Sequence, residues 1–323
     1  MQRLSLPLLQ SQIKIRSCER AELPAFLGST LRGAFGRALK SVVCIVNHGE
    51  CQRCIVKTRC IYPYIFETPV PENIIQLQGQ ARAPHPFVLS LPIEPDYNWN
   101  SKRQIYHQGD VLYFRLLLMG KAVYSLPFVI YTIQKMARQG LGVHRGKFEL
   151  AHVVDREGRE IFSAETGTLS SNLKPVPLSE LVEKRLENLH LAEDSLKVRF
   201  ISPVRIRSNG DLQTHIDFQL LMRNILRRLS QLMILHGQEA LELDFKDLLE
   251  QASKVATLSS SLRWIDLERY SSRQKTKLKI GGLVGTVRYR GNLAKFLPLL
   301  AAGEILNIGA STSFGLGEFR IEV

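Results

Sequence analysis

Residues 277–323 read KLKIGGLVGTVRYRGNLAKFLPLLAAGEILNIGASTSFGLGEFRIEV, and their pattern of apolar residues indicates the class of fold. Its first part, up to Gly291, is rich in the β-branched and aromatic side chains of a strand, and the apolar residues of 292–304 recur at helical spacing. A glycine-rich turn follows, and GEFRIEV (317–323) is again typical of a strand. The sequence therefore predicts the strand, helix and strand that end an α+β domain.

The residues before this stretch complete the same domain. LKVRFISPVRIR (196–207) is predicted to be a strand, QTHIDFQLLMRNILRRLSQLMILHG (213–237) a helix, and SLRWIDLERY (261–270) a second strand. We also expect an additional helix over FKDLLEQASKVATL (245–258). The order over 196–323 is then βαββαβ, which is the order of a ferredoxin-like domain.

The N-terminal half predicts the same order. We expect a strand over 4–16 and a helix over 24–43 with an apolar stripe of Leu27, Leu31, Phe35, Leu39 and Val42. The remaining elements are predicted strands at 86–92 and 110–120, a helix at 122–140 and a strand at 146–155. The repeat predicts two tandem ferredoxin-like, RRM-like domains, with a cysteine-rich insertion at 44–60 in the first.

Charge divides the chain into three segments. The 323 residues carry 43 Lys and Arg against 30 Asp and Glu, a net charge of +13. Residues 1–154 carry +10, residues 155–195 carry −4 and residues 196–323 carry +7. Since about 150 residues per domain is usual, we expect two basic domains at 1–154 and 196–323, joined by an acidic linker at 155–195. The basic charge favours a polyanionic partner.

Two classes of protein are disfavoured. No apolar run approaches the ~18 residues of a membrane helix, and the first residues lack the apolar region of a secretion signal. We therefore expect a cytoplasmic protein without a membrane partner.

Both halves place glycines between their last helix and last strand. These are Gly140, Gly142 and Gly146 in the first half, and Gly309, Gly315 and Gly317 in the second. Glycines there can adopt positive φ and bare their N–H groups to a phosphate, although tight turns would use them too. We predict a nucleic-acid contact in the second loop at Gly309, Ser311, Thr312, Gly315 and Gly317.

The segment from Arg263 to Lys295 is strongly basic. Its predicted nucleic-acid-binding cations are Arg263, Arg269, Arg273, Lys275, Lys277, Lys279, Arg288 and Arg290, and only Asp266 and Glu268 oppose them. Trp264, Tyr270 and Tyr289 interleave with the charges, a combination that suits phosphate neutralisation and base stacking. The alternative is a solvated rim with core aromatics. Arg205, Arg207, Arg227 and Arg228 either extend this patch or are ordinary surface charges.

Four of the five cysteines cluster as Cys44-x6-Cys51-x2-Cys54-x5-Cys60. In a reducing compartment four thiolates at this spacing can close a tetrahedral structural zinc site, and such a site leaves no open position for catalysis. An iron–sulfur cluster and free thiols are the alternatives.

Several stretches together resemble CRISPR-associated endoribonucleases of the RAMP superfamily, which process precursor CRISPR RNA. They are ISPVRIR (201–207), LLMRNILRRLSQL (220–232), LERYSSRQ (267–274), KIGGLVGTVRYRGNLAKFLPLLAAGE (279–304) and NIGASTSFGLGEFRIEV (307–323), with LRGAFGRAL (31–39), GDVLYFRLLLMG (109–120) and GLGVHRGKFEL (140–150) in the first half. The resemblance implies tandem ferredoxin-like domains and a basic groove for a repeat RNA. Its implied partners are precursor and mature CRISPR RNA and other CRISPR effector or adaptation subunits.

The resemblance also implies a metal-independent reaction without a catalytic cofactor. The ribose 2′-OH attacks its own 3′ phosphate and leaves 2′,3′-cyclic phosphate and 5′-OH ends. In many relatives a histidine at or near the first helix acts as acid or base, but helix 24–43 has none, and the nearest is His48. We assign His48 to that role, with Lys40, Arg37 or Arg32 stabilising charge and Tyr62 or Tyr64 as hydrogen-bond donor. His48 could instead bind zinc or lie in a plain loop, and His107 and His144 are further candidates.

Two other functions stay open. A non-catalytic RAMP subunit that binds guide RNA in an effector complex would have the same fold. A zinc-bearing DNA-binding regulator would suit the charge and the cysteines, but the sequence has no helix-turn-helix or zinc-finger pattern.

Overall fold

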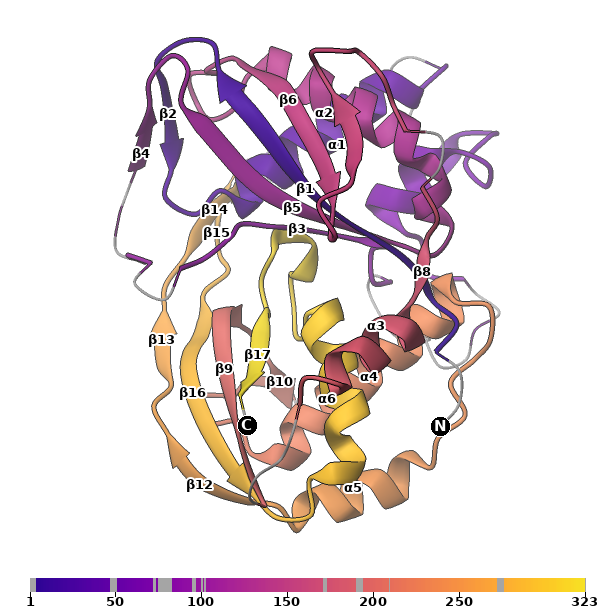
Figure 1. The fold of residues 1–323 in the computed structure, drawn as a ribbon, viewed down its shortest axis with the longest axis vertical. Helices are drawn as coiled ribbons and strands as arrows, with labels where there is room; N and C mark the ends of the chain where they lie inside the picture. Colours follow the sequence, from indigo (N-terminus) through magenta and orange to yellow (C-terminus); the bar gives the residue numbers. More distant parts are fainter. Residues whose placement is uncertain are drawn as a thin grey trace. The chain divides into compact units, whose positions relative to one another are not determined.

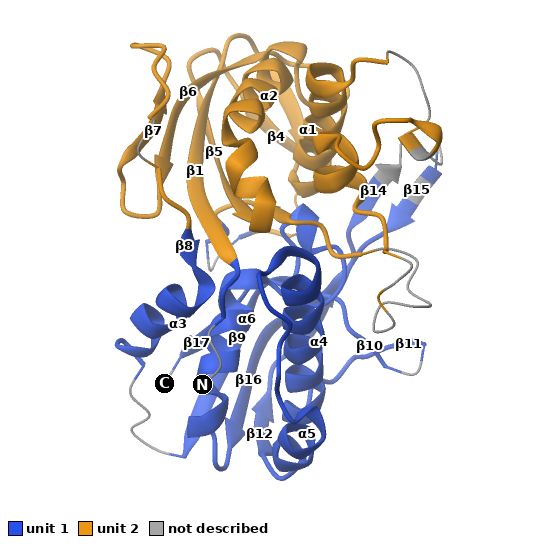
Figure 2. Cartoon of the chain, turned by 90° about the vertical axis from the view of Figure 1, so that its right-hand side faces the viewer, with its two compact units in different colours: residues 1–6, 93–97, 176–323 blue, residues 7–92, 98–175 orange. Residues whose placement is uncertain are grey.

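We describe the fold from a computed structural model of the chain. The described residues are 4–46, 51–71, 74, 83–94, 97–99, 101, 103–170, 173–189, 194–208, 210–271 and 276–322. The chain forms two compact units (Figure 2). We call residues 7–92 and 98–175 the N-terminal unit, and residues 1–6, 93–97 and 176–323 the C-terminal unit.

The N-terminal unit is an antiparallel sheet with two helices on one face (Figure 1). Its strands are β1 (Pro7–Ser17), β3 (Phe87–Ser90), β5 (Val111–Met119), β6 (Phe148–Asp155) and β7 (Glu160–Ser163), in the order β3-β5-β1-β6-β7. The helices are α1 (Gly28–Val43) and α2 (Leu126–Gln139), which is preceded by the 3₁₀ helix η4 (Gly120–Ser125). A separate pair joins β2 (Ala21–Pro24) to β4 (Arg103–Tyr106).

The core of this unit follows the predicted apolar periodicities. Ile13 and Ile15 of β1 are fully buried, and the α1 stripe of Leu27, Leu31, Phe35 and Leu39 is at most 1% exposed. Between α1 and β3 lie the short helices η1 (Cys51–Arg53) and η2 (Pro63–Glu67).

The C-terminal unit repeats this architecture. Its sheet has the order β12-β16-β9-β17, with β9 (Ser195–Val204), β12 (Ala256–Ser260), β16 (Gly282–Arg290) and β17 (Phe319–Glu322), and β13 (Arg263–Ile265) also pairs with β16. Helices α4 (Phe218–His236) and α6 (Leu297–Leu306) pack together on one face, beside α3 (Leu178–Leu186) and α5 (Phe245–Ser253). Shorter elements are η5 (Ala294–Phe296), η6 (Thr312–Phe314), β8 (Val176–Pro177) and the pairs β10 (Arg207–Ser208) with β11 (Asp211–Leu212) and β14 (Glu268–Ser271) with β15 (Thr276–Lys279).

In the N-terminal unit β1 lies between β5 and β6, and in the C-terminal unit β9 lies between β16 and β17. In both, the first strand of the βαββαβ repeat lies between its third and fourth strands, which is the strand order of a ferredoxin-like domain. The prediction of two βαββαβ domains is confirmed. The acidic segment 155–195 is divided between the units, because β7 extends the first sheet and α3 packs in the C-terminal unit.

The elements predicted over 245–270 differ from the structure, in which the expected strand 261–270 is divided into β13 and β14. The helix expected over 245–258 ends at Ser253, and residues 256–260 form the edge strand β12. Val255 and Leu258 are three positions apart, a spacing that favours a helix, so the periodicity was misleading here. No helix formed by the described part of the chain is long and apolar enough to cross a bilayer.

Candidate functional site

The glycine-rich loop between α6 and β17 has an unusual backbone. Five of its residues lie at positive φ, between 57° and 80°, namely Asn307, Gly309, Ser311, Gly315 and Gly317. The Ile308 N–H donates to the Gly317 carbonyl at 3.0 Å, and the Gly317 N–H donates to the Pro203 carbonyl of β9 at 3.1 Å. The loop is therefore closed on itself and fastened to the sheet.

Glycine is needed here for space as well as for conformation. A Cβ on Gly317 would lie 1.7 Å from the Ile308 carbonyl oxygen, and one on Gly309 would lie 2.7 Å from the Arg205 carbonyl oxygen. The N–H groups of Gly315 and Gly317 both donate to protein carbonyls, at 2.8 and 3.1 Å. The expectation that these two glycines bare their N–H groups to a phosphate is therefore wrong.

The accessible part of the loop is short. Ala310 is exposed, and Gly309, Ser311 and Phe314 are half-buried, whereas Thr312 is only 7% exposed. A ligand can therefore reach the loop at 309–311 and at the Phe314 ring.

A cationic hairpin lies against this accessible part. The Arg269 guanidinium of β14 lies 5.0 Å from the centre of the Phe314 ring. Arg205, which follows β9, donates to the Lys279 carbonyl of β15 at 2.8 Å, so both strands are tied to the loop region. Burial, and the charge of Arg207 nearby, lower the pKa of Arg205. The fold thus brings together Arg205, Arg269 and Phe314, which the sequence separates by up to 109 positions.

Several predicted cations of this hairpin are not covered by the structure. Arg273 and Lys275 lie outside the described residues, as do the side chains of Tyr270 and Lys277. Arg263 and Lys279 are exposed.

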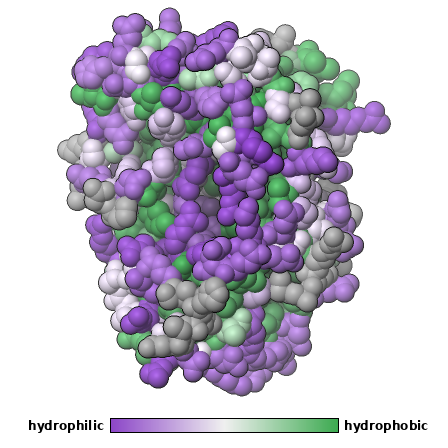
Figure 3. Space-filling model, viewed as in Figure 1, coloured by the Kyte–Doolittle hydropathy of each residue, from purple (hydrophilic) through white to green (hydrophobic). Residues whose placement is uncertain are grey.

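Further cations lie on the outer face of the C-terminal sheet. Arg288 and Arg290 project from β16 to solvent, and Lys197 of β9 is paired in register with Arg288. Glu322 binds Arg199 and Lys197, both at 2.5 Å, and these hydrogen bonds lower the pKa of its carboxyl. The outer face therefore keeps Arg288 and Arg290 as its exposed charges on β16. Hydrophilic side chains cover most of the surface seen in Figure 3.

Tyr289 is a core residue and does not face solvent. It is 0% exposed, meets the Phe218 ring edge-on at 5.2 Å, and donates its hydroxyl to the Ile216 carbonyl at 2.7 Å. Burial raises its pKa far above the usual range. The base-stacking role predicted for Tyr289 is therefore wrong, whereas Trp264 is 36% exposed and donates to Asp266 at 3.1 Å.

Arg228 of α4, one of the two helical arginines considered for the basic patch, is buried in the structure. Arg228 is 7% exposed, and its guanidinium donates to the Leu306 carbonyl at 3.4 Å, at the C-terminal end of α6. Burial lowers its pKa to about 10. Arg228 thus stabilises the end of the helix from which the glycine-rich loop begins.

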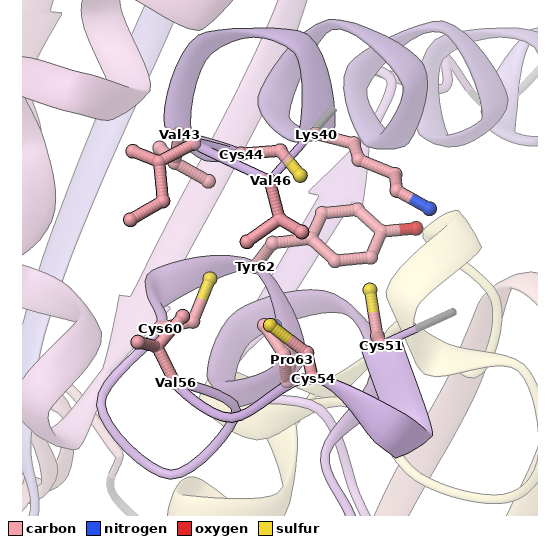
Figure 4. A pocket seen from close by; sticks show the side chains of 11 residues that line it. Lys40, Val43, Cys44, Val46, Cys51, Cys54, Val56, Cys60, Tyr62 and Pro63 are labelled. Carbon is pink, nitrogen blue, oxygen red and sulfur yellow. The ribbon is translucent and has the colours of Figure 1, made fainter. Parts of the chain in front are cut away.

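In the N-terminal unit, α1 carries the predicted catalytic cations. Arg37 is exposed, whereas Arg32 and Lys40 are half-buried. The Lys40 ammonium lies 5.8 Å from the centre of the Tyr62 ring, and Figure 4 shows the Tyr62 hydroxyl on the same side of the pocket. His48 lies outside the described residues, and His107 and His144 lie in exposed turns.

Tyr64 has a structural role. Its hydroxyl accepts hydrogen bonds from the N–H groups of Lys121 and Ala122, and burial raises its pKa to about 12. A phenol held in this way is a poor proton donor at neutral pH.

One histidine that contacts α1 was not among the predicted site residues. His85 stands between two prolines just before β3, and its Nε2 lies 3.0 Å from Nη2 of Arg32. Its Nδ1 lies 2.9 Å from the Thr68 hydroxyl, next to η2. The signal in the sequence is the APHPF stretch at 83–87, since a histidine fixed between prolines at the start of a strand has little conformational freedom.

The four clustered cysteines line a pocket of about 30 Å³ with Val46, Val56, Tyr62 and Pro63 (Figure 4). All four carry free thiols. Burial and the neighbouring Glu67 carboxylate raise the pKa of Cys51.

Figure 4 shows the Cys44 sulfur across the pocket from Cys51, Cys54 and Cys60, with Val46 and the Tyr62 ring between them. Among the described residues, no three His, Cys, Asp or Glu side chains converge to hold a metal. The structure therefore does not support the predicted zinc site at Cys44, Cys51, Cys54 and Cys60.

Comparison with known families accounts for both units. Residues 6–174 match the AF_1859_N family, described as an N-terminal domain. The chain belongs to this family. Residues 198–319 match the family of the CRISPR-associated endoribonuclease Cas6. The C-terminal part of the chain is thus similar to CRISPR-associated endoribonucleases, as its motifs predicted. An uncharacterized protein of Archaeoglobus fulgidus is 26% identical over 304 residues, which make up 93% of this chain and 92% of that protein.

Solved structures support the fold. A Cas6 product complex superposes with a TM-score of 0.58 at 15% identity, covering 98% of this chain and 99% of that chain. Thermus thermophilus Cas6 gives 0.54 at 14% identity, with the same coverage. A chain of a partial Cas6-RT-Cas1–Cas2 complex gives a TM-score of 0.59 at 15% identity. That match covers 98% of this chain but only 46% of the other chain. The chain thus spans about half the length of that larger protein.

Proposed function

We propose that this protein is an endoribonuclease that cuts precursor CRISPR RNA within its repeats. One observation carries the proposal. The residues that match the Cas6 endoribonuclease family, 198–319, build the fastened glycine-rich loop and place the Arg269 guanidinium over Phe314 beside it. A cation over an aromatic ring next to an accessible loop is a surface to which a phosphate and a base can bind together.

The binding surface is proposed to extend from this loop over the basic hairpin and the sheet face. It uses Arg263, Arg269, Arg288 and Arg290 with Lys279, and Gly309 and Ser311 at the loop. Arg273, Lys275 and Lys277 are the further cations that the sequence offers. Since phosphate contacts release counterions, affinity should fall steeply with salt. Thr312, Gly315 and Gly317 support the loop shape from inside.

Cleavage is proposed to need no metal. The O2′ forms a bond to phosphorus as the bond from phosphorus to O5′ breaks, giving a 2′,3′-cyclic phosphate and a 5′-OH. This reaction needs a base for the 2′-OH proton and cations for the charge that develops on the phosphate oxygens. Arg37 and Lys40 on α1 are the proposed cations, and His48 is the base that the sequence suggests. CRISPR RNA is the proposed partner, together with other CRISPR subunits such as the Cas1 and Cas2 named in the larger relative.

The test is incubation of the protein with labelled repeat RNA of its own host in EDTA. A second RNA carries a 2′-deoxy sugar 5′ of the cut. We expect cleavage of the first RNA, and binding without cleavage of the second. Tight binding of both RNAs without any cleavage would overturn the proposal and favour a guide-binding RAMP subunit. The absence of histidine from α1 is consistent with that second function.

A further inference from the structure

A chain of hydrogen bonds in the N-terminal unit fixes the tautomer of His85. A guanidinium has only donors, so the Arg32 Nη2 contact at 3.0 Å makes His85 Nε2 the acceptor. Nδ1 then carries the proton and donates to the Thr68 hydroxyl oxygen at 2.9 Å, and this hydroxyl donates to the Tyr64 carbonyl at 3.0 Å. The ring is thus neutral, with its basic nitrogen facing α1.

Packing holds the ring in this orientation. Phe66 of η2 stacks on His85 with centroids 6.4 Å apart, and Phe87 of β3 lies at 5.9 Å. Thr68, whose hydroxyl oxygen accepts the hydrogen bond from Nδ1, is only 4% exposed. A base oriented through its second nitrogen by a buried acceptor is the arrangement that proton-transfer sites use.

The face of α1 opposite His85 carries two cations and a glycine. Arg32, Gly36 and Lys40 follow one another at intervals of four, so they share one face of the helix. The Phe66 ring occupies the place of a side chain at Gly36, since a Cβ there would lie 2.1 Å from the ring. Each position therefore has its own partner across the gap. His85 contacts Arg32, the Phe66 ring lies against Gly36, and the Tyr62 ring lies near Lys40. The arrangement combines one neutral imidazole, two cations and a stack of aromatic rings.

We propose that His85 is the catalytic base of the RNA cleavage, an assignment that rests on the proposed function. His85 Nε2 takes the proton of the 2′-OH as O2′ bonds to phosphorus and the bond to O5′ breaks, and water protonates O5′. The Arg32 guanidinium leaves the imidazole and binds a non-bridging phosphate oxygen. There its positive charge stabilises the negative charge that develops on the phosphate. Thr68 is a positioning residue, because it acts through His85. This role replaces the one assigned to His48.

The test compares single-turnover cleavage of labelled repeat RNA between pH 5 and 9 by the wild type and by His85→Ala, His85→Gln and His48→Ala. A lost general base costs about 10²- to 10⁴-fold in rate, so both His85 variants should cut at least 100-fold more slowly. Each should bind the RNA within threefold of wild type and lose the decline in rate at acidic pH. His48→Ala is included because His48 is the base that the sequence suggested.

The glutamine variant separates catalysis from structure. Its amide oxygen can accept from Arg32 and its amide nitrogen can donate to Thr68, so it preserves the fold but cannot take a proton. If His85→Gln cuts within threefold of wild type, or if His48→Ala alone abolishes the acidic decline, the assignment to His85 is wrong while the proposed function stands. If wild type binds the RNA and does not cut it, both are wrong.

Discussion

Substituting Gly317 with alanine tests whether the glycine-rich loop is held by its backbone. Alanine at the φ of +74° costs about 1–2 kcal/mol in free energy of unfolding. The new Cβ would also lie 1.7 Å from the Ile308 carbonyl oxygen, so the two must separate by more than 1 Å. That movement breaks the bonds between Ile308 and Gly317 and between Gly317 and Pro203, at about 1 kcal/mol each. We expect a total loss of about 3–4 kcal/mol.

Gly210→Ala is the matched control. Gly210 belongs to the same unit and has a φ of +90°, but nothing lies within 4 Å of the place of its Cβ. This variant should lose only the conformational part, about 1–2 kcal/mol. Urea unfolding followed by circular dichroism measures both, and a filter-binding assay should show weaker repeat-RNA binding for Gly317→Ala only. Equal losses of stability in the two variants would refute the argument from the close contact.

Three further predictions concern polar side chains of the C-terminal unit. Tyr289→Phe should lose about 1 kcal/mol of unfolding free energy, because its hydroxyl bond is lost, and a changed RNA affinity would contradict its core position. Arg185→Ala should lose about 3 kcal/mol, because it removes the 2.8 Å partner of the 2%-exposed Glu304 carboxylate and leaves it the longer ion pair to Arg320 at 3.6 Å. An Arg185→Met/Glu304→Met variant that is no more stable than Arg185→Ala would argue against this. The hydrogen bond from Arg199 lowers the pKa of Glu322, so its stabilisation is present above about pH 4.3 and is lost as pH falls through the folded pKa. Glu322→Gln should flatten stability between pH 5 and 3, and an unchanged acid dependence would exclude that contribution.

The repeated strand and helix order was predictable because each element shows its buried face in the sequence. The same rule should have placed Tyr289 in the core, since it alternates with Arg288 and Arg290 and shares a face with Val287. The aromatic and basic composition of the segment suggested a stacking role, but the two-residue period decides the side of the strand.

The candidate catalytic group could not be found by reading along the chain. His85 is 53 positions from Arg32, and only the closure of β3 onto the sheet brings the two together. The cysteine spacing is a different case. It permits a metal site, but Val46 and the ring of Tyr62 separate Cys44 from the other three sulfurs, and spacing alone carries no information about what lies between ligands.

The C-terminal unit is not continuous in the chain. The carbonyls of Leu4 and Leu6 accept hydrogen bonds from the N–H groups of Ser179 at 3.1 Å and Leu178 at 2.9 Å, and both leucines are buried. During synthesis these leucines leave the ribosome long before α3 is made, so the C-terminal unit is completed only after the N-terminal unit has been translated. Splitting the gene between the two sheets would leave one product with two uncovered leucines and the other without the segment that pairs with α3. The C-terminal unit therefore needs both ends of one continuous chain to be complete.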